Sequence, residues 1–416
     1  TLAIGVENGR LQLMRHEHDE SPVLIDTGLT ATNLKWSTNG TVLALAGSYG
    51  GSGGSREVAM VQFYSPYGQH LRTLKVPGGG IQAVSWEGGS LRVALAVDTF
   101  IYFANIRPDY RWGFFGDTLV TAYAQPERTD SSVLFWNTKT DERTVKYYDR
   151  LLSVRVASEN CVIATQTESP TQQYALLLCN AIGSPLDSKH VDVEPTFLSA
   201  TPYHVVCASH SFVYVWQYRT LMSKLTSVDL GTSSLRRKEG RERCFHIDDP
   251  PDKNQSEALP DVNGRDPSAD PIIAIGASQH CLLVARESGA MLRYSLPHIA
   301  LEHTYSLRCR PQTIAINCES TRAAIVDTNG VFTLFDLGSP GADTFGKGEV
   351  MVPAATEGEM EQRFERKDVW DVKWADDNAD LFAVMEKTRM YIFNGLTAEE
   401  PVPSTAYICS FNELQI

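Results

Sequence analysis

A short apolar strand that ends in a bulky residue recurs along the chain at intervals of roughly forty residues. Successive copies are separated by 40, 33, 43, 37, 78, 41 and 58 residues. In chain order, the bulky residues are Phe63, Phe103, Trp136, Cys179, Trp216, Tyr294, Phe335 and Phe393. Repeats of about 40–45 residues with four short strands each are typical of WD-type β-propeller blades. This spacing therefore constrains the fold more than any other feature of the sequence.

Many of these strands follow a second element, in which an alternating strand turns and continues as a more apolar strand. The clearest copies are LKWSTNGTVLALAG at 34–47, VSWEGGSLRVALAV at 84–97 and VKWADDNADLFAVM at 372–385. A period of two residues around a turn of Asn, Asp, Gly or Ser predicts a β-hairpin. Because no segment carries a sustained helical period, we predict an all-β chain built from tandem WD-type β-propellers. A β-sandwich array fits less well, since a sandwich module needs more strands per repeat.

The number of repeats predicts two propellers, because one propeller has about four to eight blades and this chain has more anchors. Residues 1–108 are expected to form the last two to three blades of an N-terminal propeller that is incomplete in this sequence. Residues 109–416 are expected to form a second propeller of about six to seven blades. Inserts at 231–270 and 338–365, and the Gly-rich segment 47–55, are expected to be surface loops.

Large aromatic residues at repeated positions are predicted to form the cores of the blades. The set is Trp36, Trp86, Trp136, Trp216, Trp374, Phe63, Phe103, Phe335 and Phe393. Three of the tryptophans, Trp36, Trp86 and Trp374, occupy one position just before the hairpin turn. Such regularity favours packing between blades over a ligand cage.

The charge balance argues against nucleic acid as a partner. Lys and Arg number 37 and Asp and Glu number 50, which gives a formal net charge of −13. Proteins that neutralise phosphates usually carry the opposite balance. No apolar run approaches the roughly 20 residues that cross a bilayer, so we expect no transmembrane segment. Eight cysteines without a CxxC pair indicate a reducing compartment such as the cytoplasm.

We expect no catalytic, metal-binding or cofactor-binding residues, and hence no enzyme. The His16–Glu20 segment is the densest group of potential metal ligands, but no second pair of ligands lies near it in the sequence. The Gly-rich stretches at 50–54 and 78–80 precede strands, whereas a phosphate loop opens a helix. Motifs for a serine nucleophile, a zinc protease or a kinase are missing from the sequence.

One basic segment, RRKEGRER at 236–243, stands out in this acidic chain. Its cationic residues are Arg236, Arg237, Lys238, Arg241 and Arg243, and they are the candidate partner-contact residues. They could contact an acidic protein or a phosphoinositide head group. Alternatively, the segment is a solvated insert whose charges are partly balanced by Glu239 and Glu242.

Several stretches, in order along nearly the whole chain, are similar to one family. They include LRTLKVPG at 71–78, LAVDTFIYFANIRPDYRWG at 95–113, LCNAIGSPLD at 178–187, RRKEGRER at 236–243, DVWDVKWA at 368–375 and MEKTRMYIF at 385–393. The chain thus resembles the WD-repeat subunit of intraflagellar transport complex A, the WD repeat domain protein thirty-five family. It departs from that pattern at 47–55, 254–270 and 338–365.

The resemblance implies a role that the residue patterns alone do not show. Members carry tandem N-terminal propellers followed by a helical solenoid, and they have no catalytic residues; by this resemblance the chain would hold the end of the first propeller and all of the second, and would lack the solenoid. They act as scaffolds of complex A in retrograde ciliary transport, cilium assembly and entry of membrane proteins into cilia. Implied partners are the other complex A subunits, complex B and adaptors for membrane cargo. The implied location is the cytoplasm and the cilium or flagellum, including basal body and axoneme.

Two other functions remain open at this level. The first is a vesicle-coat-type propeller that binds peptide signals of its cargo directly. A cluster of basic and aromatic residues on one propeller face would favour it. The second is a propeller enzyme, which would need convergent carboxylates or metal ligands at the central channel.

Overall fold

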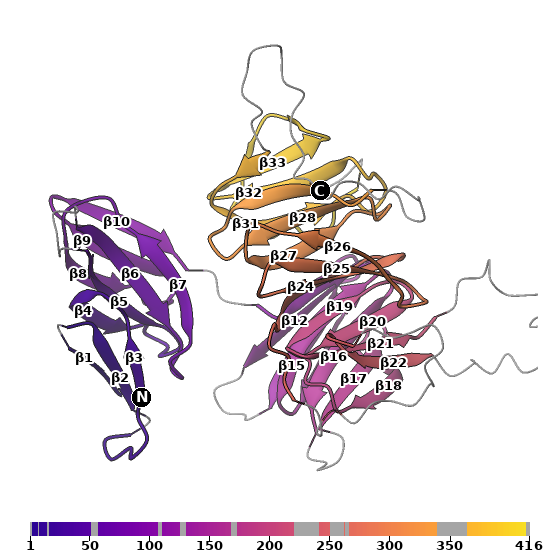
Figure 1. Cartoon of the computed structure of the whole chain (residues 1–416), viewed down its shortest axis with the longest axis horizontal. Helices are drawn as coiled ribbons and strands as arrows, with labels where there is room; N and C mark the ends of the chain where they lie inside the picture. Colours follow the sequence, from indigo (N-terminus) through magenta and orange to yellow (C-terminus); the bar gives the residue numbers. More distant parts are fainter. Residues whose placement is uncertain are drawn as a thin grey trace, which may run out of the picture. The chain divides into compact units, whose positions relative to one another are not determined.

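The structure, a computed structural model, is built from β-strands. It describes residues 2–6, 8–14, 16–50, 57–106, 110–124, 130–167, 173–219, 241–249, 262, 266–338 and 364–412. The chain divides into two compact units, Thr1–Asp109 and Tyr110–Ile416 (Figure 1). Within the described ranges, no helix is long and apolar enough to cross a membrane.

The first unit contains three antiparallel sheets, drawn in indigo and purple in Figure 1. The first sheet is β1 (Leu2–Gly5), β2 (Arg10–Met14) and β3 (Val23–Asp26). The second is β4 (Thr30–Trp36), β5 (Leu43–Tyr49), β6 (Val58–Tyr64) and β7 (His70–Lys75). The third is β8 (Ile81–Trp86), β9 (Arg92–Val97) and β10 (Phe100–Asn105). Only the second sheet has the four strands of a full blade among the described residues.

The second unit contains six sheets, each a run of consecutive antiparallel strands. The first three are β11 (Trp112–Phe115), β12 (Thr118–Ala124), β13 (Ser131–Asn137) and β14 (Arg143–Tyr148); β15 (Leu151–Ala157), β16 (Asn160–Gln166), β17 (Tyr174–Cys179) and β18 (Pro185–Val191); and β19 (Phe197–Ala200), β20 (His204–Ala208), β21 (Phe212–Gln217) and β22 (Glu242–His246). The fourth and fifth are β23 (Ile272–Ala277), β24 (Cys281–Arg286), β25 (Ala290–Ser295) and β26 (Leu301–Ser306); and β27 (Pro311–Ile316), β28 (Arg322–Asp327), β29 (Phe332–Asp336) and β30 (Glu365–Arg366). The last is β31 (Val369–Trp374), β32 (Leu381–Glu386), β33 (Arg389–Asn394), β34 (Thr397–Ala398) and β35 (Val402–Pro403).

The three hairpins predicted most clearly from the sequence are confirmed as the pairs β4–β5, β8–β9 and β31–β32. Two expected loops are partly strands instead. The segment 47–55 was expected to be a loop, but β5 continues through Tyr49 because Gly47 and Ser48 pair with β6. The insert 231–270 contains β22, which pairs with β21 along its whole length and completes the third sheet. The rest of these segments, and residues 339–363 of the other insert, lie largely outside the described ranges.

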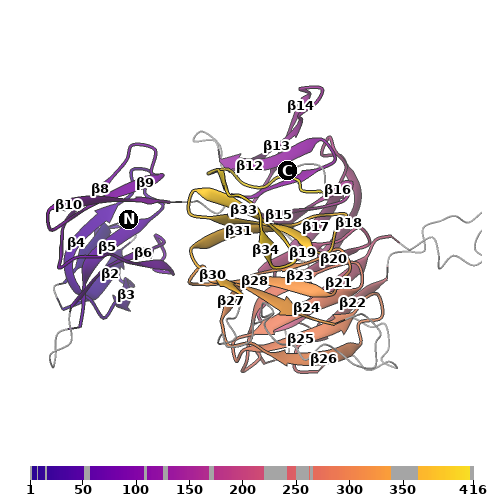
Figure 2. The ribbon, with the colours of Figure 1, turned by 90° about the horizontal axis from the view of Figure 1, so that it is seen from above.

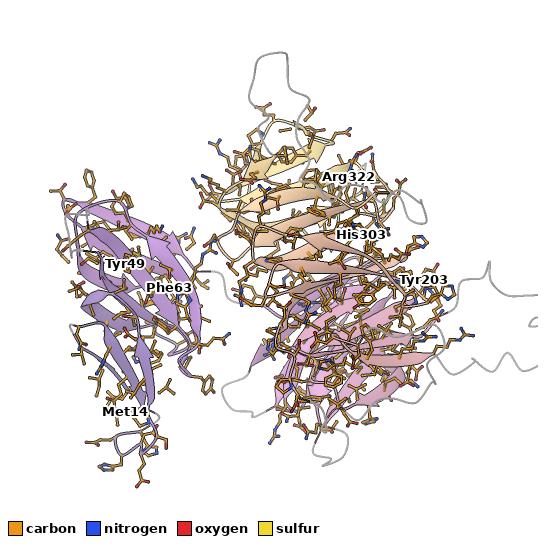
Figure 3. All side chains as sticks on the ribbon, in the orientation of Figure 1. Met14, Tyr49, Phe63, Tyr203, His303 and Arg322 are labelled. Atoms are coloured by element: carbon orange, nitrogen blue, oxygen red, sulfur yellow. The ribbon has the colours of Figure 1, made fainter. Side chains whose placement is uncertain are left out.

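The core of each unit lies between neighbouring sheets, where apolar side chains of one sheet pack on those of the next. Figure 3 labels Phe63, which lies in such a layer. In the second unit, Val206 and Val215 of the third sheet pack with Leu282 and Val284 of the fourth. Figure 2 shows the sheets following one another from magenta through orange to yellow. Burial of these alternating apolar residues is the main force that holds the sheets together.

Short polar contacts join neighbouring sheets at the hairpin turns. In the first unit, the hydroxyls of Thr38 and Ser90 form a hydrogen bond between the second and third sheets. In the second unit, the hydroxyls of Ser278 and Ser320 are 2.7 Å apart and join the fourth and fifth sheets. Ser90 and Ser320 both have positive φ angles, 59° and 63°, and occupy matching turns. The same contact thus recurs in both units, as expected for one repeat.

Candidate partner-contact surface

The basic segment predicted from the sequence leads into β22, the outer strand of the third sheet of the second unit. Arg236, Arg237 and Lys238 lie outside the described residues. Arg241 is exposed, and its backbone carbonyl accepts a hydrogen bond from the N–H of Gln217 at 2.9 Å. This bond sets the register in which β22 starts to pair with β21. The backbone of Arg241 is therefore held in place, and its side chain is exposed on the protein surface.

Arg243 differs from Arg241, because its side chain donates a hydrogen bond to another part of the protein. It lies on β22, where it is half-buried, and its Nη1 donates a hydrogen bond to the carbonyl of His298 at 3.2 Å. His298 belongs to the turn between β25 and β26, so this bond joins the third sheet to the fourth. Arg243 is thus placed to fasten β22, and Arg241 is the cation of this pair that faces solvent.

The carboxylate of Glu242 forms an ion pair and a hydrogen bond on the side of β22 opposite to the side chain of Arg243. Its Oε1 lies 2.5 Å from Nζ of Lys189 on β18, in an ion pair whose side chains are both about a quarter exposed or less. Its Oε2 accepts a hydrogen bond of 2.7 Å from the hydroxyl of Tyr214. Burial, and then the Glu242 carboxylate, raise the pKa of Tyr214, so this hydroxyl stays protonated and donates. The sequence suggests that Glu242 partly balances the charge of the neighbouring arginines, but in the structure its carboxylate pairs with Lys189.

The predicted blade-core residues fall into three groups by exposure. Trp216, Trp374, Phe63, Phe335 and Phe393 are buried, with at most 6% of their surface exposed. Trp36, Trp86 and Trp136 are half-buried. The Trp136 ring contacts polar groups of its own hairpin, since its Nε1 donates to Asp141 at 2.8 Å and Arg143 lies over the ring at 5.1 Å.

Phe103 departs from the prediction that it lies in a blade core, because 72% of its surface is exposed. It lies on the edge strand β10 and pairs with Ala94, in the register in which Phe63 pairs with Ala44. Phe63 is covered by the third sheet, whose Trp86 ring packs against it at 6.2 Å. No described sheet of the first unit covers the matching face of β10. The repeat therefore gives Phe103 the position of a core residue, but none of the described sheets of the first unit packs on it.

A fully buried cation in the second unit was missed by the sequence analysis. Arg293 on β25 has no exposed surface. Its Nε lies 3.2 Å from Oε2 of Glu302 on β26, and its Nη1 donates to the carbonyl of Leu337 at 2.6 Å. Leu337 follows β29, so Arg293 ties the fourth sheet to the fifth. The sequence indicates such a residue only by the arginine in the otherwise apolar strand MLRYS, at a position where an apolar side chain would be expected.

Potential metal ligands and cysteine thiols can be placed among the described residues. These residues contain no group of three His, Cys, Asp or Glu side chains that could hold a metal ion. All eight cysteines are free, and six of them are buried or half-buried. Burial raises the pKa of the Cys179 thiol to about 11 and of the Cys244 thiol to about 12, so both are protonated and weakly nucleophilic at neutral pH.

Comparison with known proteins identifies the family. A model described as the WDR35 second beta-propeller matches residues 112–416, which is well over half of the chain. The chain belongs to the WDR35 family. A second model, described as WDR35/TULP4 N-terminal, matches residues 1–107. The WDR35 domains and the observed sheets together make this an all-β protein of tandem propellers, as the sequence predicted.

The curated WDR35 relatives are similar along the whole chain. WD repeat-containing protein 35 of Rattus norvegicus is 48% identical over 415 residues, covering 100% of this chain and 35% of its own length. The protein of the same name from Homo sapiens is 47% identical over 426 residues, with the same coverage. This chain therefore spans about a third of the relatives it matches. Among solved structures, Hsv2p of Kluyveromyces lactis has a TM-score of 0.43 and 7% identity, covering 90% of this chain and 99% of that chain.

Proposed function

We propose that this chain acts as a non-catalytic scaffold within intraflagellar transport complex A. The observation that carries the proposal is the identity of 47–48% to WD repeat-containing protein 35 across the entire chain. In this proposal the chain supports retrograde ciliary transport, cilium assembly and entry of membrane proteins into cilia. It works in the cytoplasm and the cilium, through contacts with other complex A subunits, complex B and cargo adaptors.

Scaffolding is consistent with the physical character of the two units. Each sheet is held to the next by an apolar layer, and the second unit adds internal ties such as the buried Arg293. A rigid body of this kind keeps its surface loops at fixed positions, so several partners can be held in one geometry. Residues 1–108 and 109–416 would then contribute two such bodies, the end of one propeller and a second propeller.

The surface around Arg241 is the proposed site of one partner contact. Arg243 and Glu242 are engaged inside the protein and hold β22 in place, which leaves Arg241 exposed at its start. An exposed guanidinium on a fixed strand suits an acidic protein surface, because a planar donor can bind a carboxylate through two hydrogen bonds. In this proposal Arg236, Arg237 and Lys238 add charge to the same contact.

A pull-down from ciliated cells tests both parts of the proposal. The tagged chain should recover other complex A subunits, identified by mass spectrometry. Recovery of vesicle-coat subunits without ciliary transport subunits would refute the scaffold function and favour the cargo-receptor alternative. The triple variant Arg236→Glu, Arg237→Glu and Arg241→Glu should lower recovery about tenfold, since reversing charges at an interface costs over 1 kcal/mol.

A matched control separates a specific contact from a general effect of charge. Arg72→Glu reverses an exposed arginine on β7, the outer strand of a four-stranded sheet in the first unit. Its recovery of complex A subunits should equal that of the unchanged chain. Equal recovery by the triple variant would remove the contact at Arg241 and leave the scaffold function standing.

A further inference from the structure

The last described segment of the second unit, residues 404–412, crosses the face of its last sheet; we refer to it as the C-terminal strap. Three hydrogen bonds fasten the strap along its length. The Ser404 N–H donates to the carbonyl of Thr388 at 3.0 Å, and the Ile408 N–H donates to Oδ2 of Asp371 at 3.3 Å. Near its end, the carbonyl of Phe411 accepts from the N–H of Asp376 at 3.0 Å. The strap therefore follows β31 from one end to the other.

Apolar side chains of the strap cover one face of the last sheet. At other junctions in this unit, the face of a sheet is covered by the neighbouring sheet. Ile408 and Phe411 are 6% and 2% exposed, and they pack on Leu381, Ala383 and Met385 of β32. Between the third and fourth sheets, by contrast, the corresponding layer is made by the strands of two sheets. The strap thus covers the outer face of the last described sheet, where the other junctions have a neighbouring sheet.

Tyr407 connects this junction to the start of the unit. Its ring lies 5.2 Å from the Trp370 ring, centroid to centroid, and 5.4 Å from the Trp112 ring. Trp370 lies on β31 in the last sheet, and Trp112 begins β11 in the first sheet. The Tyr110 ring is also close, at 6.1 Å, and Tyr110 is the first residue of the second unit. One side chain therefore touches the last sheet, the first sheet and the residue that follows the boundary between the units.

The geometry of these rings is favourable. The planes of Tyr407 and Trp370 are inclined at 86°, and those of Tyr407 and Tyr110 at 87°. Edge-to-face pairs of this kind are attractive because the positive edge of one ring meets the negative face of another. Trp370 is itself held in place, since its Nε1 donates to the carbonyl of Lys387 at 3.0 Å. The cluster can therefore transmit the position of the strap to Trp112 and Tyr110.

We propose that Tyr407 is a latch that joins the first and last sheets of the second unit. The proposal rests on the scaffold function only in its purpose, because a scaffold needs a rigid body on which its partners are held. Removing the ring should free Trp112 and Tyr110 without unpacking the middle sheets. The junction between the first and last sheets would then open more readily while the rest of the second unit stays folded.

The purified full chain with Tyr407→Ala tests the latch by hydrogen exchange. Amides of β11 and β31 should exchange about tenfold faster, and amides of β20 and β24 at the original rate, because aromatic contacts are lost at one junction only.

Conservative variants keep the test decisive. Tyr407→Phe retains the ring and should keep the slow exchange of β11 and β31. Tyr407→Leu fills the space without a ring, so it should speed exchange in the same two strands as Tyr407→Ala. Unchanged exchange in β11, or equally faster exchange in every sheet, would overturn the proposal. Since no partner is present, these results do not depend on whether the chain belongs to complex A.

Discussion

The indole Nε1 of Trp374 donates a hydrogen bond to the backbone carbonyl of Ala315, at 3.0 Å, and so ties β31 to the inner strand of the preceding sheet. Trp86 makes the same bond in the first unit, to the carbonyl of Lys35 at 3.2 Å. Both tryptophans end the first strand of a sheet, and both acceptors lie on the first strand of the sheet before. Trp86 and Trp374 thus both pack on the neighbouring sheet and bond to it, whereas the buried Nε1 of Trp36, at the same repeat position, has no hydrogen-bond partner among the described residues.

Replacing Trp374 by Phe should destabilise the second unit by about 1–2 kcal/mol, because the Ala315 carbonyl loses its donor and part of the buried ring is removed. Urea unfolding followed by circular dichroism measures the change. Trp136→Phe is the matched control, since that indole bonds to the exposed Asp141 carboxylate. Its cost should stay below about 0.5 kcal/mol. Equal losses in the two variants would contradict a role for the bond between sheets.

Phe63 and Phe103 occupy equivalent repeat positions, but truncating them should change the free energy of unfolding by very different amounts. Phe63→Ala should destabilise the first unit by about 3–5 kcal/mol, because it leaves a cavity under Trp86. Phe103→Ala should change stability by no more than about 0.5 kcal/mol, because the side chain is largely in solvent. It should also reduce self-association, measured by analytical ultracentrifugation, since an exposed apolar edge strand promotes it. A large loss of stability in Phe103→Ala would show that β10 is covered in solution.

Arg293→Met should destabilise the second unit by about 3 kcal/mol, because it leaves the Glu302 carboxylate without its buried partner. The double variant Arg293→Met and Glu302→Gln should recover part of that loss, since it also removes the unpaired charge. Thermal unfolding of the single and double variants at pH 7 gives the coupling. Strictly additive losses would mean that Arg293 stabilises the unit through partners other than Glu302, such as the carbonyl of Leu337.

The buried side chain of His204 should make the free energy of unfolding depend on pH. The side chain is 2% exposed, and burial lowers its pKa to about 4. In the unfolded chain the imidazole binds a proton near pH 6.5, so the unfolded state takes up the proton first as the pH falls. Stability contributed by the neutral imidazole is complete above about pH 6.5 and is lost progressively down to about pH 4.

The measurement is the free energy of unfolding between pH 7 and pH 4. His204→Asn removes the titrating group, so its stability should fall less steeply over this range than that of the unchanged chain. Parallel pH curves for the unchanged chain and His204→Asn would rule out His204 as the source.

The repeat made most of the fold predictable, because hairpins such as β31–β32 are encoded by local alternation and turn residues. β22 was not predicted, since its short sequence ERCFH lies within a long charged segment and it forms only by pairing with β21. Phe103 shows the other limit of a repeat. Its position predicts a core residue, but burial depends on a further sheet that the local sequence does not specify.

The candidate site was less predictable than the fold. The sequence identified the basic segment by its composition, but the distinct roles of Arg241 and Arg243 depend on neighbours from other sheets. His298 and Lys189 lie far from β22 in the sequence and reach it only through the arrangement of the sheets. The Tyr407 cluster is a similar case, since its rings come from both ends of the second unit.

The chain has two exposed cysteines that can be labelled with a fluorescent dye. Cys318 and Cys409 are exposed, whereas the other six cysteines are buried or half-buried. Although both residues are exposed, their sulfur atoms are partly shielded from water, and this raises the pKa of both thiols. A maleimide dye should therefore label them slowly at neutral pH and faster in mildly alkaline buffer. Cys409 lies in the C-terminal strap, two residues after Tyr407, and Cys318 lies in the turn after β27. A dye at Cys409 can therefore report movement of the strap by its fluorescence, with a dye at Cys318 as the reference on the same unit.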